Sequence, residues 1–134
     1  MTRRDLMAMP AAAAMAGRGR LKQGVTRGCF GKGMAFEDMA RHAARLGATG
    51  FDLIGEDGWP VLKKYGLTPT MAPGAGNIRE ALNRKENHGA LESVMRSNLQ
   101  KAAANGVPNV ITFSGNRAGM GDEEAIENCA AFLR

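Results

Sequence analysis

Apolar residues recur at three- and four-residue intervals in several stretches of the chain. This spacing places them on one face of an α-helix, with charged residues towards the opposite face. We therefore expect helices over 36–46, 59–65, 90–104 and 122–133, together with one helical turn at 78–82.

Two of the expected helices carry start signals. Pro60 lies in the first turn of the second helix, where a missing N–H costs little. Asp122 is the expected N-cap of the last helix, whose first turn is rich in acids. The apolar faces expected to be buried consist of Phe36, Met39, Ala40, Ala43 and Leu46, of Leu91, Val94, Met95, Leu99 and Ala102, and of Ile126, Cys129, Ala130 and Leu133.

Three helical segments end at a glycine that precedes a short apolar run, and each run closes in a glycine-rich polar loop. Glycine adopts the left-handed helix cap without a Cβ penalty, and short apolar runs between such signals are typical of buried parallel strands. Pro69 has no N–H to donate, so the third strand should be short or irregular. The expected strands cover 21–26, 50–54, 67–71 and 109–113.

Four strands that alternate with helices predict an α/β fold with two possible architectures. One is a partial (β/α)8 TIM barrel of about four β/α units, and the other is a small doubly wound sheet of flavodoxin type. The last expected helix reaches Arg134 without a C-cap, which favours the N-terminal half of a barrel over residues 20–134.

The positive charge of the chain is concentrated near its start. The chain has 134 residues and a net charge of +5, but residues 1–22 hold five of its 18 basic residues and one acid. The remaining 13 basic and 12 acidic residues nearly cancel, so a nucleic-acid-binding face is not expected. No apolar run approaches the roughly 20 residues of a membrane span.

Residues 1–19 resemble an export signal. Arg3 and Arg4 precede a short apolar stretch that ends in Ala14-Met15-Ala16, an A-x-A cleavage site. The pattern favours a twin-arginine-like signal and a periplasmic or exported protein. The alternative is a disordered alanine-rich leader on a cytoplasmic protein.

In both architectures ligands bind in the loops that follow the strands. The strongest candidate is 114–117, where Ser114, Asn116 and Arg117 suit a carboxylate or a hydroxyl-rich substrate. The alternative is a turn in which the polar side chains bond their own backbone. His88, in a polar loop, is interpreted as a helix cap or a pocket wall.

The other chemistry-bearing residues form no recognisable site. Cys29 and Cys129 are 100 positions apart and are expected to be buried small hydrophobes. The sequence shows no metal-ligand set, no Ser-His-Asp or Cys-His pairing and no phosphate-binding loop.

Several motifs occur in order over about 20–134, namely Lys22-Gln23, Arg27, Cys29-Phe30, 51–55, Trp59-Pro60, 62–67, 83–88, 106–111 and 113–117. Together these motifs resemble hydroxypyruvate isomerase-like proteins of the xylose isomerase-like TIM-barrel group. Gly28 departs from the pattern, since the family commonly has tryptophan there.

The resemblance implies isomerisation of hydroxypyruvate or a related keto acid or sugar through an enediol. It also implies a divalent Mg or Mn ion in the full-length family member and a possible homo-oligomer, while this half alone would be inactive, bind no metal and hold no catalytic residue. The substrate-binding positions that carry over are Cys29, Phe30, His88, Ser114, Asn116 and Arg117. The alternative function is a non-catalytic flavodoxin-like module that binds an anionic metabolite at 114–117.

Overall fold

The computed structural model describes residues 21–134, so the leader expected over 1–19 lies outside the described residues. Strands and helices alternate throughout, which confirms the α/β class. None of the described helices combines the length and the hydropathy needed to cross a bilayer. The elements are β1 (Gly24–Val25), α2 (Phe36–Arg45), β2 (Gly50–Asp52), α3 (Trp59–Lys64), β3 (Thr68–Pro73), α4 (His88–Ala104), β4 (Val110–Ile111) and α5 (Asp122–Leu133).

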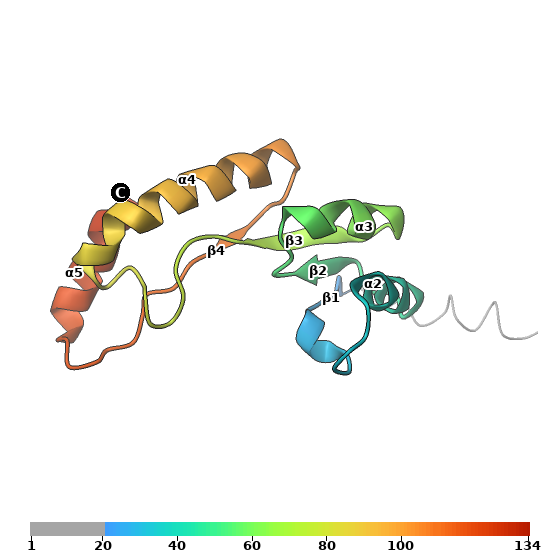
Figure 1. Cartoon of the computed structure of the whole chain (residues 1–134), viewed down its shortest axis with the longest axis horizontal. Coiled ribbons are helices and arrows are strands. Elements are labelled where there is room, and N and C mark those ends of the chain that lie inside the picture. The colour runs from blue at the N-terminus through green and yellow to red at the C-terminus, as the bar shows by residue number, and fades with distance from the viewer. Residues whose placement is uncertain (1–20) are drawn as a thin grey trace, which may run out of the picture.

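The four strands form one parallel sheet in the order β1-β2-β3-β4 (Figure 1). Each strand thus lies beside the next strand in the sequence. A flavodoxin-like sheet has the order 2-1-3-4-5, in which the direction of winding reverses. The described part of the chain contains no such reversal.

β3 is the longest strand and is held by different neighbours along its two halves. Its first half pairs with β2, and Ala72 and Pro73 pair with β4. The expected irregularity occurs where Phe51 faces Pro69, because the register shifts between Phe51 and Asp52. The strand is six residues long, so the prediction of a short or irregular strand is met by its irregularity and not by its length.

β1 is shorter than expected, with two residues in place of six. The carbonyl of Thr26 accepts a hydrogen bond from the Cys29 amide at 3.1 Å, which begins a 3-10 turn. That turn takes the chain out of the sheet directly after β1. The first post-strand loop therefore starts close to the sheet.

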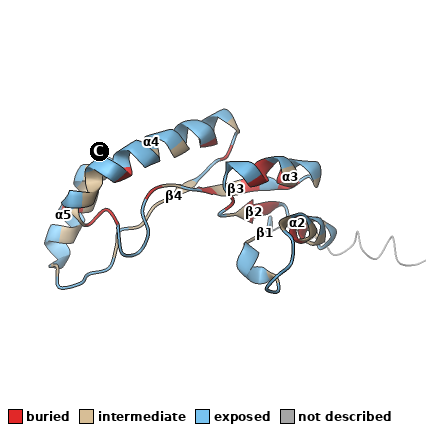
Figure 2. Cartoon of the chain, viewed as in Figure 1, coloured by how far each residue is buried: buried red, intermediate tan, exposed pale blue. Residues whose placement is uncertain are grey.

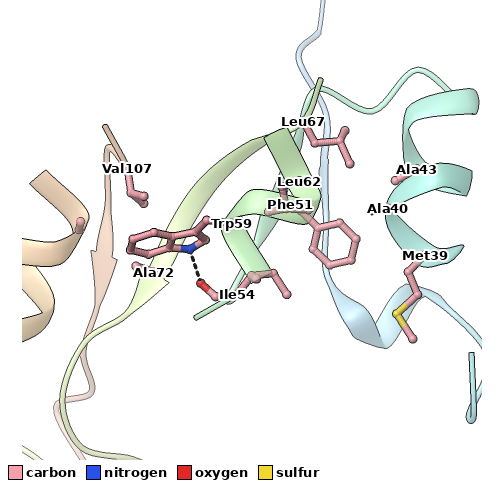
Figure 3. Packing of buried hydrophobic residues seen from close by; sticks show 11 residues of the cluster. Met39, Ala40, Ala43, Phe51, Ile54, Trp59, Leu62, Leu67, Ala72 and Val107 are labelled. Carbon is pink, nitrogen blue, oxygen red and sulfur yellow. Dashed lines mark hydrogen bonds between the residues drawn. The ribbon is translucent and has the colours of Figure 1, made fainter. Parts of the chain in front are cut away.

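The main core lies between the sheet and helices α2 and α3 (Figure 3). The Phe51 ring is fully buried and contacts the Phe36 ring edge-on, with a centroid distance of 5.5 Å. Trp59 is also buried, and its Nε1 donates a 2.8 Å hydrogen bond to the Ile54 carbonyl. Ala102 and Val107 join this core from the end of α4 and the loop after it.

A second, smaller core lies around α4 and α5. Ala75, Leu82 and Leu91 are buried in it, and Cys129 and Phe132 pack against them. Figure 1 shows an elongated molecule with α5 and the start of α4 at one end and β1 and α2 at the other. We call residues 21–73 the sheet lobe and residues 74–134 the helical lobe.

The apolar faces of the helices are less buried than their periodicity predicts, as the pale blue of α4 and α5 shows (Figure 2). Both helices contact the rest of the lobe along a narrow stripe through Leu91 and Phe132. The expectation of full burial is therefore wrong for several residues. The exposed positions are Leu46 at 85%, Val94 at 50%, Leu99 at 48%, Ile126 at 67% and Leu133 at 66%.

Two local expectations fail because polar side chains bond elsewhere. Gly121, not Asp122, is the N-cap of α5, and the Asp122 carboxylate pairs with Arg117. The expected helical turn at 78–82 is absent. There the Asn77 Oδ1 accepts hydrogen bonds from the Arg79 and Glu80 amides, an arrangement that competes with a helix.

Candidate functional site

The loop that follows β4 lies alongside the segment 78–83, which follows β3. Three backbone hydrogen bonds join them, from Leu82 N to Phe113 O, from Asn83 N to Ser114 O and from Asn116 N to Ile78 O, at 2.9–3.1 Å. Two post-strand loops are thus fixed against each other. The Ser114 and Asn116 side chains are carried on this supported backbone and are exposed.

Asn83 lies at the centre of this junction and is 2% exposed. Its Nδ2 donates to the Asn116 carbonyl at 2.8 Å, and its own carbonyl accepts from Asn128 Nδ2 at 2.9 Å. Its Oδ1 is buried without a hydrogen-bond partner and faces Gly115. Gly115 has φ +109°, and a Cβ there would overlap that oxygen. The loop can therefore take this shape only with glycine at 115.

Arg117 reaches into solvent from this supported loop. Its guanidinium pairs with the Asp122 carboxylate at 2.6 Å, and about 70% of each side chain is exposed. Arg84 donates hydrogen bonds to the carbonyls of Arg117 and Ala118, at 3.0 and 3.2 Å. Arg84 thus fixes the backbone at 117 and 118, while the ion pair between Arg117 and Asp122 remains open to competition from another carboxylate.

His88 contacts the segment 78–83 on one side and α5 on the other. Its Nε2 lies 2.7 Å from the Leu82 carbonyl, and its ring contacts the Phe132 ring edge-on at 5.2 Å. Asn87 is the N-cap residue of α4, and His88 is the first residue inside the helix. His88 therefore links the loop after β3 to α5.

Cys29 and Phe30 lie in the sheet lobe, away from the other expected site residues. The Cys29 thiol is free and exposed, so the expectation that it is buried is wrong. It lies in the 3-10 turn after β1, which has no buried residue. The Phe30 ring stacks on the Phe51 ring at 5.8 Å. Within one chain the six expected residues therefore form two groups. Cys29 and Phe30 follow β1, at one edge of the sheet, whereas the other four lie near the loop after β4, at the opposite edge.

Backbone strain is found in the same post-strand loops. Leu53, after β2, has φ +60°, and Ala118, after β4, has φ +41°. These are the non-glycine residues with positive φ between 21 and 134. Such conformations cost on the order of 1–3 kcal/mol and cluster at functional sites. The strained residues therefore mark the loops after β2 and β4 as candidate functional loops.

The loop after β2 is connected to α4 by an ion pair. Lys101 Nζ lies 2.8 Å from Glu56 Oε2. The hydrogen bond that Lys101 donates to this carboxylate, and then the charge of Glu56, raise the pKa of Lys101 above its usual value. The pair connects the loop after β2 to the end of α4 through two half-exposed side chains.

Sequence reasoning missed a hollow on the face of the sheet that α2 and α3 leave open. It has a volume of about 1250 Å³. The Thr70 hydroxyl hydrogen-bonds the Asp52 carboxylate on its floor, and Gly24 and Thr68 also line it. The polar residues Thr68 and Thr70, on either side of the buried Pro69, indicate that one face of β3 is open. A prediction that every strand is buried on both faces overlooks this pattern.

The metal implied by the resemblance needs several oxygen or nitrogen donors in one place. Across 21–134, no three His, Cys, Asp or Glu side chains are grouped so that they could hold a metal ion. The described residues do not fit that metal.

Comparisons with protein-family models, curated proteins and solved structures gave no match. The chemistry of this chain has to follow from its own geometry. Among the described residues, the loop 114–117 is the group of exposed polar residues whose backbone is held by the most hydrogen bonds, through Asn83 and its neighbours. We call this loop and Asn83 the rim.

Proposed function

We propose that the chain recognises a small keto acid or sugar acid at the carboxyl ends of its strands, as part of a hydroxypyruvate isomerase-like (β/α)8 barrel. The sequence resemblance supplies the substrate class and the isomerisation through an enediol. Ser114, Asn116 and Arg117 bind the substrate in this proposal. No residue of the chain is assigned to proton transfer.

The observation that carries the proposal is the strand order. Four parallel strands that neighbour one another in sequence order, each followed by a helix, are the repeating arrangement of a barrel. The doubly wound order 2-1-3-4-5 instead reverses its direction between the second and third strands. The strand order therefore supports the barrel, and with it a site at the carboxyl ends.

The chemistry of the rim supports an acidic substrate. A guanidinium forms strong, directional hydrogen bonds with carboxylates, and the exposed Arg117 side chain extends from a loop whose backbone is bonded by Arg84. The exposed pair that it forms with Asp122 contributes no more than about 1 kcal/mol, so a substrate carboxylate can replace Asp122. Ser114 and Asn116 then face the hydroxyl and carbonyl groups of the same molecule.

Binding of hydroxypyruvate to the purified chain, measured by calorimetry, tests the proposal. A hydrogen bond to a charged group contributes about 1.5–3 kcal/mol, so Arg117→Ala should weaken binding at least about tenfold. Arg96→Ala is the matched control, because Arg96 is also exposed and pairs with an acid, Glu92, on α4. The control should bind like the unmodified chain.

Two results would contradict the proposal. One is the absence of saturable binding, and the other is an equal loss in the Arg117 and Arg96 variants. Pyruvate, which lacks the hydroxyl group, should bind more weakly than hydroxypyruvate if Ser114 and Asn116 contact that group.

A further inference from the structure

We propose that Arg84 is a positioning residue for the substrate. It holds a strained turn at the end of the rim and thereby fixes the direction in which the Arg117 side chain leaves the loop. The inference rests on the proposed function, because the Arg117 guanidinium is the group assigned there to the substrate carboxylate. Arg84 itself is assigned no substrate contact, so its effect on binding passes through Arg117.

The rim ends in a tight turn over residues 117–120. The Met120 amide donates a hydrogen bond to the Arg117 carbonyl at 2.9 Å, and the central residues Ala118 and Gly119 have φ +41° and +83°. Positive φ at both central residues is typical of a type I′ turn, in which Asn-Gly, Asp-Gly and Gly-Gly are the preferred pairs. Glycine adopts this conformation freely, whereas the Cβ of alanine is strained in it. Contacts from outside the turn therefore have to hold Ala118.

Arg84 supplies these contacts with one nitrogen atom. Its Nη2 donates to the carbonyl oxygens of Arg117 and Ala118, at 3.0 and 3.2 Å. These carbonyls belong to the peptide units on either side of the Ala118 Cα. Each peptide unit is planar, so holding both carbonyls towards one nitrogen restricts the rotation between the two units, which is the strained rotation. The first unit also contains the Arg117 Cα, so the same bonds fix where the Arg117 side chain starts.

The backbone of Arg84 is itself held on both sides. Its amide donates to the Ala81 carbonyl at 3.2 Å, and its carbonyl accepts from the Asn87 amide at 3.0 Å. The preceding residue, Asn83, is buried and donates to the Asn116 carbonyl at 2.8 Å. The Arg84 side chain therefore extends from a fixed backbone, as a positioning role requires.

The Arg117 side chain depends on its backbone for direction. It is mostly exposed, and its bond to the Asp122 carboxylate is the contact that a substrate carboxylate replaces in the proposed function. Ordering a long side chain on binding costs entropy, and the cost is smaller when the backbone that carries it is already fixed. Arg84 thus contributes to affinity by preorganising Arg117.

The turn is tested first without substrate, by nuclear magnetic resonance. A positive φ brings the amide and α hydrogens of a residue close together, so Ala118 should give a strong nuclear Overhauser effect between them. Arg84→Ala should weaken this signal, and so should Arg84→Lys, which keeps the charge on a shorter side chain without the guanidinium fork. Adding Ala118→Asn to Arg84→Ala should restore the strong signal at 118, because an Asn-Gly pair favours this turn by itself.

Calorimetry with hydroxypyruvate then tests the link to Arg117. Arg84→Ala and Arg84→Lys should each weaken binding about three- to tenfold, the cost of ordering one long side chain. When Arg117→Ala is already present, Arg84→Ala should have no further effect, because a residue that acts through Arg117 then has nothing to position. Arg79→Ala removes an exposed arginine from the loop after β3 and is the control, which should bind like the unmodified chain.

Three results would overturn the inference. They are an Overhauser effect at Ala118 that Arg84→Ala leaves unchanged, a loss of binding that persists beside Arg117→Ala, and full binding by Arg84→Lys. If the unmodified chain binds no hydroxypyruvate while the turn depends on Arg84, the proposed function is wrong and the positioning of Arg117 by Arg84 stands. If the unmodified chain and Arg84→Ala bind equally well, the positioning role is wrong and the proposed function stands.

Discussion

At the scale of single residues, the shape of the candidate rim depends on one position. Gly115 combines φ +109° with a close approach to two side chains, because a Cβ would overlap Asn83 Oδ1 and lie 2.8 Å from Ala81 Cβ. Gly119 has a similar φ of +83°, but nothing lies within 4 Å of the place where its Cβ would be. Comparing substitutions at these two glycines therefore distinguishes the effect of backbone strain, which both share, from that of crowding, which only Gly115 has.

We therefore expect Gly115→Ala to destabilise the protein by about 3 kcal/mol, combining left-handed strain with overpacking. Gly119→Ala should cost about 1 kcal/mol, from backbone strain alone. Thermal unfolding followed by circular dichroism measures both. Equal losses would show that Asn83 does not restrict position 115.

The buried amide of Asn83 also shows what the sequence could not predict. Asparagine in a polar stretch such as 83–88 is normally exposed, so the residue type alone predicts an exposed side chain. Its burial depends on Asn116 and Asn128, 33 and 45 positions away. Contacts at that separation leave no local pattern. The exposed Ser114 and Arg117, by contrast, were found from their place after a strand.

At the scale of elements, a three-residue cluster links α2 to the end of α3. Glu37 Oε1 accepts hydrogen bonds from Lys64 Nζ at 2.5 Å and from Tyr65 Oη at 3.0 Å. The hydrogen bond from Lys64, followed by that from Tyr65, lowers the pKa of Glu37 below its usual 4.5. The hydrogen bond to Glu37, followed by the charge of Glu37, raises the pKa of Lys64 above its usual 10.5.

These shifts define a pH window for the stabilising effect of the cluster. A lowered carboxyl pKa contributes stability above 4.5 that is lost as pH falls through the folded-state pKa. A raised lysine pKa contributes stability below 10.5 that is lost as pH rises through its folded-state pKa. Glu37→Gln should therefore be less stable than the unmodified chain at neutral pH, with a difference that shrinks at both extremes.

Urea unfolding at a series of pH values measures that difference. Glu92→Gln is the control, since Glu92 pairs with Arg96 inside α4 and joins no two elements. A Glu37→Gln difference that does not change with pH would contradict the assignment.

The bounds of the four helices were predicted to within two residues, because their apolar positions repeat with the period of a helix. The strands were predicted from short apolar runs between glycines, and β1 and β4 have only two residues each. Burial was predicted poorly in α4 and α5. Periodicity gives the apolar face of a helix, but it does not say how much of that face another element covers. Val94 and Ile126 are on the predicted faces and remain exposed for want of a neighbour among the described residues.

At the scale of the whole molecule, the two cores differ in size and share no buried residue. The main core contains eleven buried residues, nine of them from the sheet lobe, with Ala102 and Val107 from the helical lobe, and the second core contains three, so the sheet lobe should be the more stable. The α/β class and four parallel strands followed from the sequence pattern. The division into lobes did not, because it depends on how far α4 and α5 lie from β1.

We expect the lobes to unfold in two steps on heating. Trp59 is the single tryptophan and is buried in the sheet-lobe core, so its fluorescence reports that core. The far-ultraviolet circular dichroism is dominated by α4 and α5 and should change at a lower temperature. Coincident transitions would show one cooperative unit instead.

The divided pairing of β3 has a consequence for hydrogen exchange. The Thr68 amide bonds the Thr49 carbonyl inside the sheet lobe, while the Ala72 amide bonds the Asn109 carbonyl of the helical lobe, at 3.0 and 2.8 Å. An amide exchanges with solvent only when its own hydrogen bond opens. The exchange rates of two amides four residues apart on β3 therefore report the opening of different lobes. The Thr68 amide reports the sheet lobe and the Ala72 amide reports the helical lobe.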